Sequence, residues 1–149
     1  MSRKRGRLQV MARWLAAGLL LCLSSVSLAD EDKRILVELP ERMQQHMMAN
    51  MRDHLETINR MLELMADEQL EAAGELAEQR LGMSSLAAHG AEHMGRFMPE
   101  GMRKAGMEMH RAASRFAVVA QEGDLALGYK TLPEITAACT GCHAGYRIR

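Results

Sequence analysis

The sequence predicts an all-α protein, folded as an antiparallel four-helix bundle. Three observations support this prediction. Apolar residues recur at spacings of three and four along most of residues 38–147, which is the period of an amphipathic helix. Glycines, prolines and a Glu-Gly-Asp turn divide this region into four stretches with short connections. No stretch alternates β-branched apolar residues with polar ones, so no strand is expected. Four helices around one core favour the bundle architecture.

The first two helices are expected over residues 38–65 and about 67–89. Pro40 stands near the start of the first helix, where the opening turn tolerates proline. Apolar residues then line one side of each stretch. These residues are Met47, Met48, Met51, Leu55, Ile58, Met61, Leu62 and Met65 in the first helix, and Leu70, Ala73, Leu76, Ala77, Leu81 and Leu86 in the second.

The third and fourth helices are expected over about 102–121 and 125–147. The connection before the third is marked by glycine and proline, namely Gly90, Gly95, Pro99 and Gly101. Residues 122–124 form the turn after the third helix, and Asp124 is placed to cap the fourth. Pro133 is expected to kink or restart the fourth helix, because proline removes one backbone hydrogen bond and crowds the preceding turn. The core side of the third helix carries Ala105, Met109, Ala112, Ala113, Phe116 and Val119.

Residues 1–29 are typical of an export signal. Five basic residues precede an apolar run over 14–23, and Ser27-Leu28-Ala29 supplies the small residues that a signal peptidase reads. Cleavage is expected before Asp30. The apolar run is shorter than the about 20 residues that span a bilayer. The mature domain, residues 30–149, is therefore expected in the periplasm without a membrane span, and Cys22 is expected to be removed with the signal.

Near the end of the last predicted helix the chain reads Cys139-Thr140-Gly141-Cys142-His143, a C-x-x-C-H run. This pattern attaches haem covalently in c-type cytochromes. Residues three apart share a helix face, so Cys139 and Cys142 can each bond one porphyrin vinyl group while His143 binds the iron. A redox dithiol is disfavoured because no βαβ pattern is present, and a zinc site because it normally has four ligands. We therefore expect one covalently attached haem c.

The ending of the chain, C-x-x-C-H-x-x-Y-R over residues 139–147, resembles that of the class II cytochromes c, the cytochrome c-prime family and its low-spin relatives. The resemblance implies a four-helix bundle with the haem on the last helix and a distal residue on the first. The family's Arg-x-x-x-Met-x-x-Met-x-x-His run is matched in its last three positions by Met48, Met51 and His54, whereas Gln44 takes the place of the arginine. By this register Met48 is the candidate distal iron ligand, and Met51 lines the distal pocket.

Alternatives for these roles stay open. Met47, Met51 and His46 could replace Met48 as the iron ligand, and a methionine stripe is also typical of an adaptable core. Arg147 follows His143 by four positions, so on a helix it would share that face and support the histidine or pair with a haem propionate. The competing interpretation of Arg147 is a surface charge at a helix end.

The distal residue separates the possible functions, none of which is enzymatic. A methionine sulfur on the iron raises the reduction potential and favours electron transfer, the function we expect first. Without that ligand, the resemblance implies a five-coordinate iron that binds nitric oxide or carbon monoxide. A third alternative is a periplasmic copper-binding protein, because methionine and histidine cluster at several places and suit copper. His89 and His93, spaced i, i+4, could chelate one metal ion.

Charge bears on the partners. The whole chain has 19 basic and 19 acidic residues, and residues 1–29 hold five basic and no acidic ones, which leaves 14 against 19 and a net charge of −5. No basic stripe remains for nucleic acid. The acidic balance favours docking onto a redox partner with a basic patch. The resemblance also implies a homodimer through the first two helices as one option, and Leu36, Leu39 and Met43 near the start of the first helix could extend an apolar surface.

Overall fold

The structure is a computed structural model that describes residues 31–149. The predicted export signal over residues 1–29, its cleavage before Asp30, and Cys22 lie outside the described residues. Most of the described chain is helical, and the all-α prediction is confirmed. The elements are β1 (Ile35–Leu36), α2 (Glu41–Ala66), α3 (Leu70–Arg80), the 3-10 turn η1 (Met83–Ser85), α4 (Ala91–Gly95), α5 (Glu100–Ala120), α6 (Leu125–Gly145) and β2 (Tyr146–Arg147).

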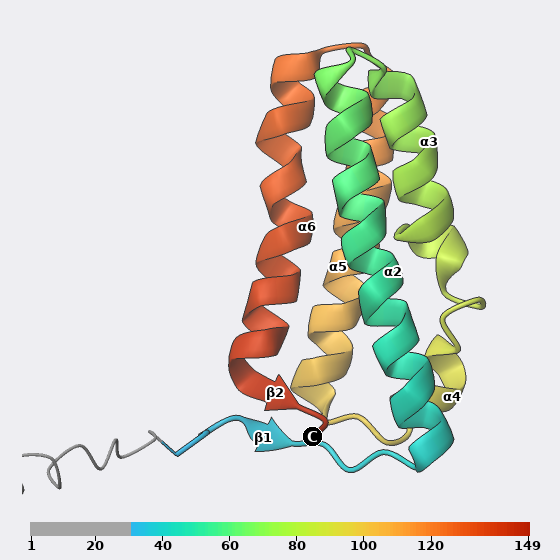
Figure 1. The fold of residues 1–149 in the computed structure, drawn as a ribbon. Coiled ribbons are helices and arrows are strands. Elements are labelled where there is room, and N and C mark those ends of the chain that lie inside the picture. Colours follow the sequence, from blue (N-terminus) through green and yellow to red (C-terminus); the bar gives the residue numbers. More distant parts are fainter. Residues whose placement is uncertain (1–30) are drawn as a thin grey trace, which may run out of the picture. The chain divides into compact units, whose positions relative to one another are not determined.

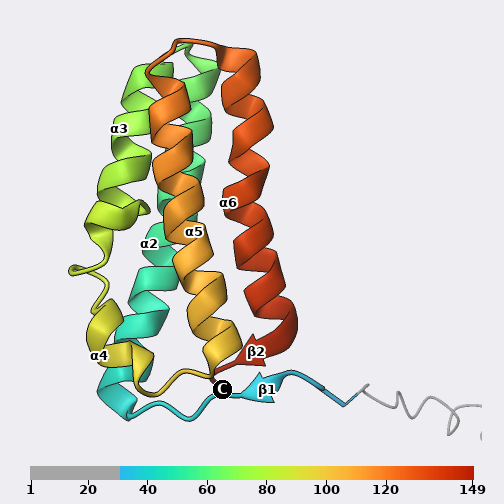
Figure 2. The ribbon, with the colours of Figure 1, turned by 180° about the vertical axis from the view of Figure 1, so that it is seen from behind.

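The longer helices α2, α3, α5 and α6 lie lengthwise beside one another, as the view in Figure 1 and the opposite view in Figure 2 both show. α3 packs against both α2 and α5, and α6 packs along α5. The backbones of α2 and α6 stay farther apart than those of these packed pairs. The first turns of α2 and the last turns of α6 lie at the same end, where β1 pairs with β2.

Proline and aspartate mark the starts of three helices. Pro40 and Pro99 precede α2 and α5 with an extended backbone, a position where the missing N–H of proline loses no helical hydrogen bond. The predicted first and third helices are thereby confirmed, apart from shifts of three and two residues at their starts. The Asp124 side chain accepts a hydrogen bond from the Leu127 backbone N–H at 2.9 Å, which confirms the predicted cap of α6.

The predicted second helix over residues 67–89 is wrong in its second half, because α3 ends at Arg80. A Cβ at Gly82 would collide with Glu78, so this position in the turn after the helix fits only glycine without a shift. The Ser84 hydroxyl donates to the Glu78 carbonyl oxygen at 2.7 Å. Serine side chains compete with helical hydrogen bonds in this way. The expected open connection that follows contains the short helix α4.

The predicted restart of the fourth helix at Pro133 is wrong, since α6 continues through it from Leu125 to Gly145. The helix also ends two residues before the predicted end. Tyr146 and Arg147 form β2, which pairs in parallel with β1. The expectation that no strand occurs is therefore wrong at this short ladder. A two-residue strand has no room for an alternating pattern, so only the long-range pairing reveals it.

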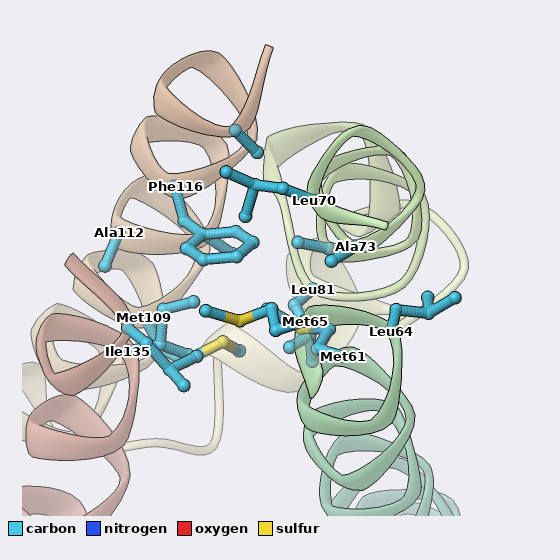
Figure 3. Packing of buried hydrophobic residues seen from close by; sticks show 14 residues of the cluster. Met61, Leu64, Met65, Leu70, Ala73, Leu81, Met109, Ala112, Phe116 and Ile135 are labelled. Atoms are coloured by element: carbon cyan, nitrogen blue, oxygen red, sulfur yellow. The ribbon is translucent and has the colours of Figure 1, made fainter. Parts of the chain in front are cut away.

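One apolar core, here called the main core, lies among α2, α3, α5 and α6 (Figure 3). Alanines on α3 and α5 allow these helices to approach closely, and larger side chains fill the space between the four helices. The largest side chains that are fully buried are Phe116, Met61, Met65, Leu81 and Ile135.

The predicted burial of two apolar residues of α2 is wrong. Leu55 is 72% exposed and Leu62 is 41% exposed. Apolar residues spaced by three and four cover a broad face of α2. In the described structure the neighbouring elements bury only part of that face. The helices remain amphipathic, and in the part of the chain that is described none has the length and apolarity needed to cross a bilayer.

Candidate functional site

The two cysteines of the C-x-x-C-H run lie in the last two turns of α6. Neither sulfur forms a disulfide within residues 31–149, and both residues are half-buried. Burial raises the pKa of the Cys139 thiol and of the Cys142 thiol, so both are protonated at neutral pH. The spacing of three residues sets both thiols on one helix face.

The two thiols contact different apolar clusters. Cys139 packs against the main core. Cys142 packs against a second group of side chains, here called the methionine cluster. Its members come from the segment after β1, the first turns of α2, the α4 region, the start of α5 and the residues at the end of α6 and after it. Its buried members are Val37, Met47, Met94 and Met102, and its partly buried members are Leu39, Met51, Met98, Cys142, Tyr146 and Ile148.

His143 lies directly after Cys142, and its side chain is exposed. Its backbone carbonyl oxygen accepts a hydrogen bond from Arg34 Nη1 at 3.4 Å, which ties the end of α6 to the segment before β1. The position is four residues after Cys139, so His143 shares a helix face with that thiol. Two thiols and one imidazole thus lie together within the final turns of one helix.

The candidate distal residues lie on the first turns of α2 and are separated by the packing. Met51 is partly buried in the methionine cluster with Cys142, and Met47 is buried there. Met48 is also partly buried but lies outside that cluster. Met47 and Met51 therefore belong to the same apolar cluster as Cys142, whereas the family register selects Met48.

Arg147 does not lie on the helix face of His143, and this prediction is wrong. α6 ends at Gly145, and Arg147 is half-buried in β2 opposite Leu36. The hydroxyl group of the neighbouring Tyr146 lies against Gly101 in the first turn of α5. The contact is so close that a Cβ at Gly101 would collide with the hydroxyl. The β1–β2 ladder, rather than a further helical turn, determines where these two side chains point.

The apolar surface expected near the start of the first helix is divided. Leu36 is 45% exposed in β1. Leu39 packs against the methionine cluster and is partly buried there. Met43 is half-buried.

The helical i, i+4 spacing that would let His89 and His93 chelate one metal ion is not present in the structure. Gly90 between them has a left-handed backbone (φ 64°) and caps the start of α4, so the two residues do not share one helix. His89 is buried in the turn before α4, and His93 is exposed on α4. The ring of His89 instead lies against His54 of α2 and His110 of α5. Spacing along the chain gave no signal for this three-histidine cluster, which only the packing of distant segments creates.

Two shallow surface hollows occur near α3 and α5, and neither is lined by a cysteine or by His143. They share the side chains of Met83, Ser114 and Val118. Comparison of the chain with protein-family models, with curated proteins and with solved structures finds no match in any of the three.

Proposed function

We propose that this chain is an exported monohaem cytochrome of the class II type, an antiparallel four-helix bundle that transfers electrons in the periplasm. The observation that carries the proposal is the pair of free thiols, Cys139 and Cys142, one helical turn apart on α6 with His143 beside them. This donor set fits haem c, because two thiols form the thioether bonds and one imidazole binds the iron on the proximal side.

The surroundings of the thiols support the same proposal. A porphyrin bonded to both sulfurs would rest on apolar side chains of the main core and of the methionine cluster. Methionine is unbranched and adaptable, so these side chains can repack around a flat ring. Bound haem would supply an iron that changes between the ferric and ferrous states, while the chain holds the ring and shields one face from water.

Arg34 and the β1–β2 ladder have a positioning role in this proposal. The hydrogen bond from Arg34 to the His143 carbonyl oxygen and the pairing of Leu36 with Arg147 hold the end of α6 against the start of the described chain. These contacts restrain the backbone that carries His143, and the exposure of His143 leaves its ring open to solvent.

The distal ligand in the proposal is a methionine of α2. Met48 is the ligand expected from the family register, and Met51 is the alternative favoured by its contact with the cluster of Cys142. A thioether sulfur from this helix would supply the second protein ligand of a bound haem and would raise its reduction potential.

A second candidate function is reversible binding of nitric oxide or carbon monoxide. The observation that favours it is the position of Met48 outside the methionine cluster. If no sulfur binds the iron, apolar side chains alone line the distal side, and a small neutral gas can occupy the sixth position.

Haem attachment is tested on the full chain, expressed in a host that matures c-type cytochromes. After denaturation and acid-acetone extraction, the wild type is expected to keep its colour and to carry the added mass of one haem. The matched control is Thr140→Ala, at an exposed position between the cysteines, and it should behave as the wild type. The Cys139→Ala/Cys142→Ala double variant should lose the colour. Wild-type polypeptide without added mass or colour would refute the proposal.

The sixth ligand is tested by optical spectra of the ferric and ferrous protein in Met48→Ala and Met51→Ala. The expected wild-type spectrum is low-spin, with a sulfur-to-iron charge-transfer band that one of the two variants abolishes. Met98→Ala is the control, because Met98 belongs to the same cluster but lies in the connection before α5. A high-spin spectrum that is unchanged in every variant, together with carbon monoxide binding to the reduced form, would refute electron transfer and support gas binding.

Docking of a redox partner follows from the charge of the mature chain. Its net charge of −5 favours a partner with a basic patch, drawn in by electrostatic steering. The rate of electron exchange should then fall as ionic strength rises, because salt screens this attraction. A rate independent of salt contradicts this part of the proposal.

Analytical ultracentrifugation of the haem-loaded protein tests the homodimer that the resemblance implies as one option.

A further inference from the structure

Three histidines from distant parts of the sequence meet inside the helical unit. His54 comes from α2, His89 from the turn before α4, and His110 from α5. The ring centroids of His54 and His89 are 4.7 Å apart, those of His89 and His110 are 5.3 Å apart, and those of His54 and His110 are 6.4 Å apart. His89 and His110 are only 8% and 7% exposed. Polar rings are seldom placed together in a protein interior without a partner to satisfy them.

Oxygen atoms hold one edge of two of these rings. His110 Nδ1 donates a hydrogen bond to the Leu81 carbonyl oxygen at 2.6 Å, so Nε2 is the nitrogen of that ring left for a ligand. His89 Nδ1 faces the Ser85 hydroxyl at 3.4 Å. His54 Nε2 is buried and has no hydrogen-bond partner among residues 31–149. Histidines that bind metals are characteristically anchored at one ring nitrogen by an oxygen and coordinate with the other.

The backbone that carries His89 is also held in place. Its carbonyl oxygen accepts a hydrogen bond from Asn50 Nδ2 at 3.1 Å, and His46 Nε2 lies 3.1 Å from the same oxygen. Both residues belong to α2, the helix of His54. The turn before α4 is therefore fixed against α2 at the point where two of the three rings meet.

The charge state suits a cationic ligand. Burial, with the neighbouring rings of His89 and His110, lowers the pKa of His54 to about 4. Burial likewise lowers the pKa of His89 to about 4, helped by His110, His46 and Arg80. Both imidazoles are therefore neutral at pH 7, the form that binds metals.

We propose that His54, His89 and His110 bind one divalent transition-metal ion of the zinc type through their ring nitrogens. With zinc–nitrogen bonds of about 2.0–2.1 Å and tetrahedral angles, the ring centroids of such a site lie roughly 5 Å apart. Two of the three observed separations match this value. The third, at 6.4 Å, is longer, and no group of three metal-binding side chains within residues 31–149 is already closed around one point. Binding therefore draws His54 and His110 together by roughly 1 Å.

The ion would connect α2, α5 and the turn before α4, the three segments that carry the histidines. This site is separate from the cysteines of α6 and does not depend on haem attachment. Three histidines leave a fourth tetrahedral position for water or another small ligand.

The test uses the full chain as purified, after treatment with a chelator, titrated with Zn²⁺ by calorimetry. The expected result is one ion per chain with a rise in melting temperature, since a ligand bound only by the folded state stabilises it. His54→Gln should weaken the affinity at least about 10-fold. His93→Gln is the matched control at an exposed position of α4, and it should leave the affinity within about twofold. The same titration of the Cys139→Ala/Cys142→Ala variant excludes the thiols as ligands, so the result stands whether or not haem is attached.

X-ray absorption at the zinc edge gives a readout that does not depend on whether a variant folds. Three nitrogen ligands from imidazole at about 2.0 Å support the site. No stoichiometric binding overturns the proposal, as does binding that survives in His54→Gln or a ligand shell without three imidazoles.

Discussion

The contact between α3 and α5 at Gly74 supports a quantitative prediction about stability. A Cβ added at Gly74 would lie 2.6 Å from the Ala120 Cβ atom and 3.2 Å from the Ala117 carbonyl oxygen. Carbon atoms in contact are normally about 3.5–4.0 Å apart, so the two helices would have to separate by roughly 1 Å. Such overpacking costs about 1–3 kcal/mol, and the better helix propensity of alanine offsets about 1 kcal/mol. Gly74→Ala should therefore lower the free energy of unfolding by up to about 2 kcal/mol.

The assay is urea unfolding followed by far-ultraviolet circular dichroism, with Gly106→Ala as the matched control. Gly106 lies inside α5, and a Cβ there meets nothing within 4 Å. Only the helix propensity then changes, so this variant should raise the free energy of unfolding by about 0.5–1 kcal/mol. The same chemical change thus has opposite effects at the two positions. An equal stabilisation by both variants would refute the close contact of α3 with α5 at Gly74.

Three further predictions concern stability. In the presence of a chelator, the free energy of unfolding should fall as the pH drops from about 6.5 towards 4, because the unfolded chain binds more protons than folded His54 and His89, whose pKa values are about 4. The total loss is about 3 kcal/mol, reduced from the fully buried limit because His54 is partly accessible, and a flat stability profile over this range would contradict it. Phe116→Ala should destabilise by about 3–5 kcal/mol in urea unfolding, because the ring is completely buried, whereas Val118→Ala, at a side chain that is 63% exposed, should change stability by less than about 0.5 kcal/mol. Asp124→Ala should cost about 1 kcal/mol through the lost hydrogen bond to Leu127, and Asp124→Asn should retain most of that stability.

Local patterns in the sequence predict most of the helices because helix formation depends on nearby residues. The apolar period, Pro40, Pro99 and the Asp124 cap place α2, α5 and the start of α6 within a few residues. The same reasoning fails where a distant contact decides the outcome. Continuation of α6 through Pro133 depends on packing against α5, and the end of α3 depends on the turn at Gly82.

The candidate site divides in the same way. The Cys-x-x-Cys-His spacing alone determines that two thiols and an imidazole share the last turns of one helix, because a helical face repeats every three to four residues. Only the tertiary structure decides which α2 methionines join the cluster of Cys142, why Arg147 leaves the helix, and that His54, His89 and His110 meet. These features arise because packing brings together side chains from segments that are far apart in the chain. The spacing of residues along the sequence does not show which distant segments come into contact.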